Sequence, residues 1–207
     1  MEVKDYQKDL AEQLKEFSVL AKAFSETGQK ISLLQKIFGL LNTSFNLHNL
    51  LDKILDYIIE VINVEAGSIL LFDKDNQELY FEVAKGSKAS EVMNFKLKPG
   101  EGIAGSVFLS QKSVAVSEVD KDERFKRKIS ENIGFETRSI ACVPIILMNK
   151  SIGVIELINK KDNNIFSLAD MEILSLASFY LVKIIQNTKI IENLKNLKNK
   201  RRDREGR

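Results

Sequence analysis

The 207-residue sequence contains one cysteine, one histidine, two prolines and no tryptophan. A lone cysteine, Cys142, excludes an internal disulfide and a multi-cysteine metal site, and it is typical of a reducing compartment. A lone histidine, His48, leaves no means of assembling a Ser-His-Asp triad or a histidine metal cluster. Because Pro99 and Pro144 are both internal, no proline-rich linker divides the chain.

Long hydrophobic runs are also missing. No uncharged run reaches the roughly 20 residues that a membrane span needs, and the first thirty residues contain no secretory hydrophobic segment. We therefore expect a cytoplasmic protein with no membrane partner.

Positive charge is concentrated at one end of a chain whose net charge is only +2. From Thr188 onward, eight lysines and arginines stand against three acidic residues. Such a tail could contact nucleic acid through phosphates, but a solvated helix end is the more ordinary interpretation. Since the remaining sequence has no basic face with interleaved aromatics, we expect no nucleic-acid partner.

A heptad pattern predicts a long N-terminal helix over residues 1–45. Four of six d positions are apolar, and a repeat of 3.5 residues keeps one seam facing a partner. The seam could instead fold back onto the chain's own domain; we favour pairing with a second chain. The a positions are all apolar: Val3, Leu10, Phe17, Phe24, Ile31, Phe38 and Phe45.

Residues 46–186 have the pattern of one globular domain. Asn46 is a suitable N-cap for an amphipathic helix that extends to Ile62. Short turns between the following apolar segments predict antiparallel hairpins, and so an α+β fold with a single six-stranded sheet. The expected strands are Ser68–Phe72, Glu78–Ala84, Val92–Leu97, Ser113–Val119, Arg138–Ile146 and Ser151–Asn159.

A second long helix is predicted over residues 168–200. It begins inside the globular domain and continues into a C-terminal helix extension and basic tail that occupy residues 187–207. Ser167 and Asp170 have the spacing of a capping box at its start. We expect a homodimer that pairs through helices 1–45 and 168–200.

The segment Gly100-Glu-Gly-Ile-Ala-Gly105 matches the dinucleotide-binding pattern G-x-G-x-x-G. That function requires a buried parallel strand leading directly into the first glycine. Here the preceding Phe95–Lys98 alternates in polarity, Pro99 intervenes, and hairpins replace helical crossovers. We therefore interpret the segment as a turn that opens a short helix.

Six segments in this order and spacing resemble the GAF domain over residues 46–186. The resemblance implies a six-stranded antiparallel sheet with the first and last helices on one face. On the other face, the middle helices and loops would enclose a small-molecule pocket. The segments are Gly67–Leu71, Gly100–Gly105, Val119–Phe125, Ser139–Pro144, Gly153–Lys160 and Phe166–Asp170.

The run Asn159-Lys160, Phe166 and Asp170 resembles a signature of the GAF domains in cyclic-nucleotide phosphodiesterases and cyclases. In that family the lysine and the aspartate form an ion pair outside the pocket, which implies a structural salt bridge between Lys160 and Asp170. Met171 occupies the position where the phosphodiesterase pattern has glutamate. This departure weakens any transfer of cyclic-nucleotide specificity.

The resemblance also implies a ligand site without catalysis. Free methionine sulfoxide reductases resemble GAF domains but work with several cysteines, whereas Cys142 is alone and has the setting of a small buried hydrophobe. We expect no bilin on Cys142 and no haem on His48. The pocket residues implied by position in the pattern are Ser68, Leu70, Ile103, Ala104, Asp120, Phe125 and Thr137.

Two functions remain open. The first is a sensory module that couples a ligand to the packing of its flanking helices; the ligand is unknown, and a cyclic nucleotide with its phosphate at the helix beginning near Gly102 is one candidate. The second is a ligand-free scaffold. Because no output domain follows Lys200, we expect action through a separate signalling partner.

Overall fold

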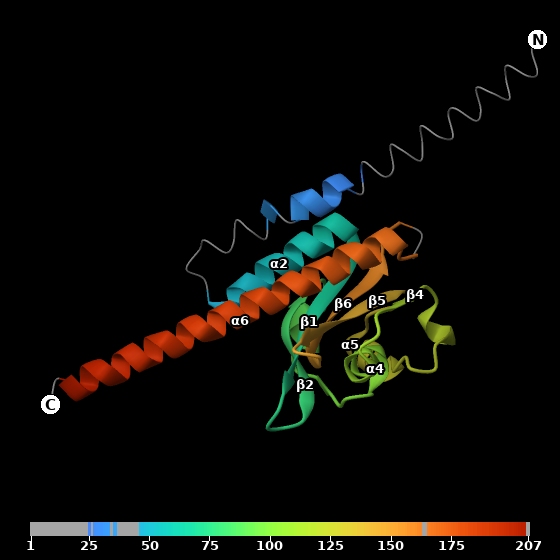
Figure 1. The fold of residues 1–207 in the computed structure, drawn as a ribbon. Coiled ribbons are helices and arrows are strands. Elements are labelled where there is room, and N and C mark those ends of the chain that lie inside the picture. Colours follow the sequence, from blue (N-terminus) through green and yellow to red (C-terminus); the bar gives the residue numbers. More distant parts are fainter. Residues whose placement is uncertain (1–24, 26, 34, 37–45, 163–164, 206–207) are drawn as a thin grey trace, which may run out of the picture.

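The computed structural model describes residues 25, 27–33, 35–36, 46–162 and 165–205 (Figure 1). Residues 27–33 are helical. The further helices are α2 (Leu47–Ile62), α3 (Ala89–Val92), α4 (Gly102–Ser110), α5 (Arg127–Ile133) and α6 (Leu168–Glu205), with a short 3-10 helix at Val119–Lys121. The strands are β1 (Val64–Asp73), β2 (Glu78–Lys85), β3 (Lys96–Leu97), β4 (Val114–Val116), β5 (Ile140–Leu147) and β6 (Lys150–Lys160).

The described strands form a single six-stranded sheet in the order β3-β2-β1-β6-β5-β4, and every neighbouring pair is antiparallel. Helices α2 and α6 lie side by side across one face, while α4 and α5 lie on the other (Figure 1). The expected α+β class with one antiparallel sheet is therefore confirmed.

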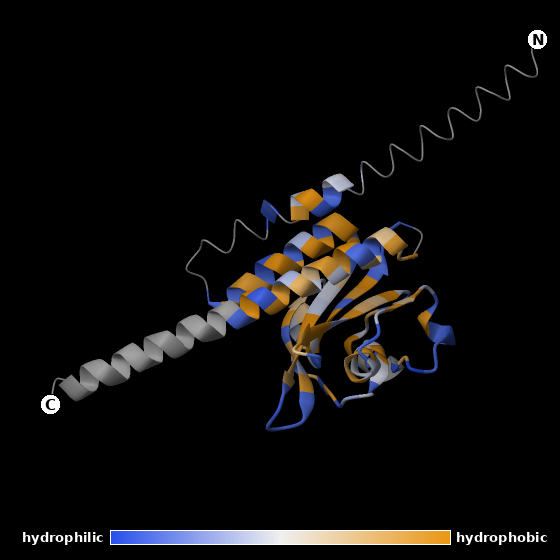
Figure 2. Ribbon diagram, viewed as in Figure 1, coloured by the Kyte–Doolittle hydropathy of each residue, from blue (hydrophilic) through white to orange (hydrophobic). Residues whose placement is uncertain are grey.

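Strand β6 is covered by protein on both faces, so alternate residues enter different cores. Ile155 and Leu157 pack with α2 and α6, whereas Val154 and Ile158 pack with α4 on the opposite face. Figure 2 shows apolar residues along the strands and on the helix surfaces that face them. The period of two along a strand thus divides the domain into two apolar layers.

Both predicted helix starts are capped as expected. Asn46 Oδ1 accepts a hydrogen bond of 2.9 Å from the backbone N–H of Asn49, at the start of α2. At the start of α6, Asp170 Oδ2 accepts from the Ser167 N–H at 2.8 Å, and the Asp170 N–H donates to Ser167 Oγ at 3.1 Å. These reciprocal bonds are those of a capping box.

The ion pair expected between Lys160 and Asp170 is present, with Nζ and Oδ1 3.0 Å apart. Lys160 Nζ also donates to the backbone carbonyl of Ile62 at the end of α2. Both charged side chains are nearly buried, and Lys160 contacts both helices. These contacts hold the end of β6 against α2 and α6.

The strand predicted over Val92–Leu97 is largely wrong. Residues 89–92 form the helix α3, and the Phe95 N–H bonds the Val92 carbonyl in a turn. Only Lys96 and Leu97 pair with β2. Alternating polarity also arises in a short helix followed by a turn, and in so short a segment the two cannot be told apart.

Most of the helix predicted over residues 1–45 lies outside the described residues. Within residues 27–33, Leu33 is fully buried in the apolar layer of α2 and α6, although it is not at a seam position. Ile31, at an a position of the predicted seam, is 51% exposed. This segment therefore packs on its own domain through one face and keeps Ile31 partly outside.

The glycine-rich segment is a local turn, as the sequence indicated. Gly100 has φ +86°, and its N–H donates to the Gly105 carbonyl at 2.8 Å. A Cβ atom on Gly105 would lie 2.6 Å from the Lys98 carbonyl oxygen. The glycines serve a tight turn and a close backbone approach at the start of α4.

We predict that Gly105→Ala lowers the free energy of unfolding by about 2 kcal/mol or more, because backbone atoms cannot yield to the new methyl group. Gly28→Ala is the control, since a Cβ there would meet nothing within 4 Å and alanine favours helix. Urea denaturation of both variants checks this. Equal stability of Gly105→Ala and the original chain would contradict the close approach.

Candidate functional site

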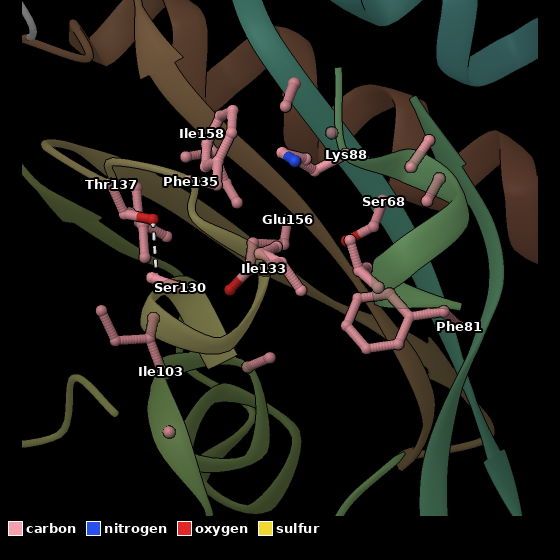
Figure 3. A pocket seen from close by; sticks show the side chains of 18 of the residues that line it. Ser68, Phe81, Lys88, Ile103, Ser130, Ile133, Phe135, Thr137, Glu156 and Ile158 are labelled. Carbon is pink, nitrogen blue, oxygen red and sulfur yellow. Dashed lines mark hydrogen bonds between the residues drawn. The ribbon is translucent and has the colours of Figure 1, made fainter. Parts of the chain in front are cut away.

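A cavity of about 100 Å³ lies between the sheet and the helices α3, α4 and α5 (Figure 3). Its walls are mainly apolar and come from β2, α4, α5 and the segment that follows α5. The apolar side chains that line it include Phe81, Val92, Leu97, Ile103, Phe125, Ile133, Phe135, Ile140 and Ile158.

Five of the seven pocket residues implied by the sequence line this cavity: Ser68, Ile103, Ala104, Phe125 and Thr137. Whether they contact a ligand stays a prediction. The other two are placed elsewhere. Leu70 is fully buried in the apolar layer beside the cavity. Asp120 is exposed in an adjoining surface depression, which shares Phe125, Ser130, Phe135 and Thr137 with the cavity.

Glu156 is the most important cavity residue that the sequence reasoning missed. It lies in the middle of β6, and its neighbours in register are Ser68 on β1 and Cys142 on β5. Protein surrounds the side chain, yet part of its surface is reachable from the cavity. In Figure 3 it lies at the centre of the site, near Ile133.

Glu156 makes no hydrogen bond or ion pair with any described residue, and desolvation by burial raises the pKa of its carboxyl to about 7. Its ordinary value is 4.5. The carboxyl is therefore close to half ionised at neutral pH. A buried carboxylate without a donor is costly, and a donor that entered the cavity would lower that cost.

Ser68 presents a second unpaired polar atom to the same space. Ser68 is only 4% exposed, and its Oγ has no hydrogen-bond partner among the residues that the structure describes. By contrast, the hydroxyls of Ser130 and Thr137 on the cavity wall bond one another at 3.1 Å (Figure 3). A buried polar group left unpaired typically costs about 1–3 kcal/mol.

Neither Cys142 nor His48 has surroundings that favour a reactive side chain at the cavity. Burial raises the pKa of the Cys142 thiol well above its usual range, and the side chain does not line the cavity. His48 Nδ1 lies 3.0 Å from Glu82 Oε1 on the outer surface of α2. Among the residues that the structure describes, no cluster of three or more His, Cys, Asp or Glu could hold a metal ion.

The lysines at the cavity have other contacts or are exposed. Lys85 Nζ lies 2.8 Å from Asp52 and 3.0 Å from Asp56, and Lys88 Nζ lies 3.4 Å from Glu91. Lys126 is exposed. The interior is thus apolar except for one carboxyl and a few hydroxyls. An anion at the start of α4 would face the Glu156 carboxyl across this small space.

The family model of the GAF domain matches residues 46–186. A curated relative, the probable 3′,5′-cyclic phosphodiesterase pde-5 of Caenorhabditis elegans, is 23% identical over 159 residues. The match covers 72% of this chain but only 22% of that protein, so the chain spans about a fifth of its length.

Solved structures show the same fold. The GAF domain of an Acinetobacter phosphoenolpyruvate-protein phosphotransferase has 26% identity and a TM-score of 0.67, over 79% of this chain and 97% of that one. The free methionine-R-sulfoxide reductase of Neisseria meningitidis, solved with its substrate, has 18% identity and a TM-score of 0.65, over 77% and 89%. At 18% identity the likeness concerns the fold alone.

In the described part of the chain, no helix combines the length and the apolar character that crossing a membrane requires.

We predict that Glu156→Gln flattens the pH dependence of stability. Because the folded pKa of about 7 lies above the ordinary 4.5, the folded chain keeps a proton that the unfolded chain releases between these values. The stability of the original chain should therefore fall as pH rises from 5 to 8, with about 2 kcal/mol from this group.

Chemical denaturation at pH 5 and pH 8 measures this difference. Glu172→Gln, on the exposed side of α6, is the matched control and should keep the full pH dependence. Equal pH dependence in the Glu156→Gln variant and the original chain would show that the carboxyl is not desolvated.

Proposed function

Because the chain belongs to the GAF domain family, we propose that it is a sensory and regulatory module of signal transduction that binds a small molecule in the cavity beside the sheet. One observation carries this proposal. Ser68 Oγ and the Glu156 carboxyl lie at a mainly apolar cavity, and neither has a hydrogen-bond partner among the described residues. Buried polar groups are normally paired, so their arrangement favours an occupant that supplies the missing donors.

The chemistry of the cavity favours binding over catalysis. Cys142 is buried with a raised thiol pKa, and His48 is at the surface of α2. In the described cavity lining, Ser68 lies opposite Glu156 but makes no hydrogen bond to it, so its hydroxyl is not paired with an activating base. We therefore infer a non-catalytic domain, although some proteins of this fold are enzymes.

The size of the cavity favours a ligand smaller than a nucleotide. Pockets for drug-sized ligands typically measure about 300–1,000 Å³, whereas this one measures about 100 Å³. A cyclic nucleotide would require α4 or α5 to move, and its phosphate would approach Glu156. The phosphodiesterase relative is matched over 22% of its length, so its named activity is not carried over to this chain.

We further infer that the flanking helices pair with a second copy of the chain. Ile31 at the predicted seam is 51% exposed, and Phe179 on α6 is 56% exposed. Strand β6 lines the cavity with one face and contacts α6 through the other. An occupant that shifts β6 would therefore favour one arrangement of the paired helices over another.

A ligand-free scaffold is the second candidate, and the small volume of the cavity favours it. In that function the helices would still pair, while water molecules would form hydrogen bonds with Glu156 and Ser68. The two candidates differ in whether the cavity takes up a molecule that changes stability.

We expect native mass spectrometry of the purified chain to show a bound small molecule, and a thermal-shift screen of metabolites that includes cAMP and cGMP to yield a hit. Ala84→Leu, which fills part of the cavity, should abolish the shift caused by the hit. Ala115→Leu is the control, because Ala115 is exposed on β4 and should leave the shift intact. A shift unaffected by Ala84→Leu would place binding elsewhere.

We expect analytical ultracentrifugation to show a dimer that Ile31→Asp combined with Phe179→Asp weakens at least about tenfold, because a charge at a buried apolar contact is costly. Met148→Asp is the control: Met148 is 84% exposed in the turn between β5 and β6 and belongs to neither helix. A monomer at all concentrations, or a dimer indifferent to the double substitution, would refute the pairing.

A further inference from the structure

Ser68 and Glu156 are placed so that one group of a ligand could form hydrogen bonds with both side chains. They are directly opposite one another on β1 and β6, so their side chains leave the same face of the sheet. Both line the cavity, as Figure 3 shows. No hydrogen bond joins them, and among the described residues the Ser68 hydroxyl has no partner and the Glu156 carboxyl has no donor.

The missing partner must donate more than one hydrogen bond. An ionised carboxylate only accepts, and a serine hydroxyl accepts through its oxygen while it donates its single proton. An ammonium group carries three donors and no acceptor, so it could bond Glu156 and Ser68 at once. A neutral alcohol has one donor, and a carboxylate ligand has none and would be repelled by Glu156.

Glu156 is the one acid among the described residues that line the cavity, and it lacks a partner there. Three lysines also line the cavity, but none of them pairs with Glu156. Lys85 is held by two aspartates, Lys88 Nζ lies 3.4 Å from Glu91, and Lys126 is exposed to solvent. A cation bound to Glu156 would therefore gain a charge-assisted hydrogen bond in a desolvated setting, where such bonds are strongest.

We infer that the ligand of this domain is a small primary amine, with its ammonium between Glu156 and Ser68 and a short apolar chain against the walls formed by Phe81 and Ile103. This inference rests on the proposed function and specifies the ligand class. An apolar cavity of about 150 Å³ holds a molecule of the size of benzene. A cavity of about 100 Å³ fits an alkyl group of about four carbons.

Binding of an amine should depend on pH through the Glu156 carboxyl. Ammonium groups stay charged well above neutral pH, so affinity rises as the carboxyl, with its pKa of about 7, loses its proton. From pH 6 to pH 8 the ionised fraction of such a group grows about tenfold. The other titratable or charged groups near the site are Cys142 on β5, Lys85 on β2, Lys88 before α3, and Arg124 and Lys126 before α5.

The test compares three probes with the same carbon frame: isobutylamine, isobutanol and isobutyrate. Each is titrated into the full chain at pH 8, and binding is measured from shifts of backbone amide signals in two-dimensional NMR. We expect saturable binding of isobutylamine at the β1–β6 site, at least about tenfold tighter than that of the other two. At pH 6 its affinity should fall about tenfold.

Two variants test the contacts. Glu156→Gln should weaken isobutylamine at least about tenfold and leave isobutanol within about twofold. Ser68→Ala should weaken isobutylamine about threefold or more. Each has a matched control with unchanged binding: Glu172→Gln for the acid, and Ser151→Ala for the hydroxyl, because Ser151 Oγ is also buried and unpaired but lies outside the cavity.

Specific outcomes overturn the inference. If isobutyrate or isobutanol binds the cavity as tightly as isobutylamine, or if Glu156→Gln leaves amine affinity unchanged, the amine class is wrong while small-molecule binding stands. If none of the probes binds and the native mass spectrum shows no small molecule, both the amine class and the sensory function fail, and water alone fills the site.

Discussion

The burial of Glu156 in a sheet that protein covers on both faces is the constraint on which the cavity depends. A strand in the middle of such a sheet directs each residue into one of two apolar layers, and β6 directs this carboxyl into the layer beneath α4. Desolvation then raises its pKa to about 7, close to the pH of the cell. The acidic group in the cavity, the ligand class proposed for it and the predicted pH dependence all follow from that one placement.

The same strand joins the cavity to the helices. Ile155 and Leu157, on either side of Glu156 in sequence, belong to the layer of α2 and α6. At the end of β6, Lys160 pairs with Asp170 and bonds the carbonyl of Ile62, so that α2 and α6 are both fastened to it. Any displacement of β6 by an occupant would therefore reach the base of both helices through packed and hydrogen-bonded contacts, without a separate relay.

The sequence predicted those parts of the fold that local chemistry determines. Asn46 and the Ser167–Asp170 box mark helix starts because their side chains bond nearby N–H groups, and apolar segments separated by short turns mark β1, β2, β5 and β6. It failed where position depends on loop geometry: Asp120 follows β4 and lies outside the cavity, because no periodicity determines where a loop residue points. Glu156 left a signal that was overlooked, as a charged residue between Val154 and Ile158 on one strand face.

An unpaired acid in an apolar layer lowers the stability of the fold, which a protein that acts only as a scaffold has no reason to retain. Glutamine or leucine at position 156 carries no charge and would avoid much of the desolvation cost that raises the pKa of the glutamate to about 7. Alanine at position 68 would remove an unpaired hydroxyl. Local conflicts of this kind concentrate where function opposes stability. Two of them face one another across adjacent strands and open into one cavity, so a shared occupant explains both. That juxtaposition supports the proposed binding site over an ordinary packing defect.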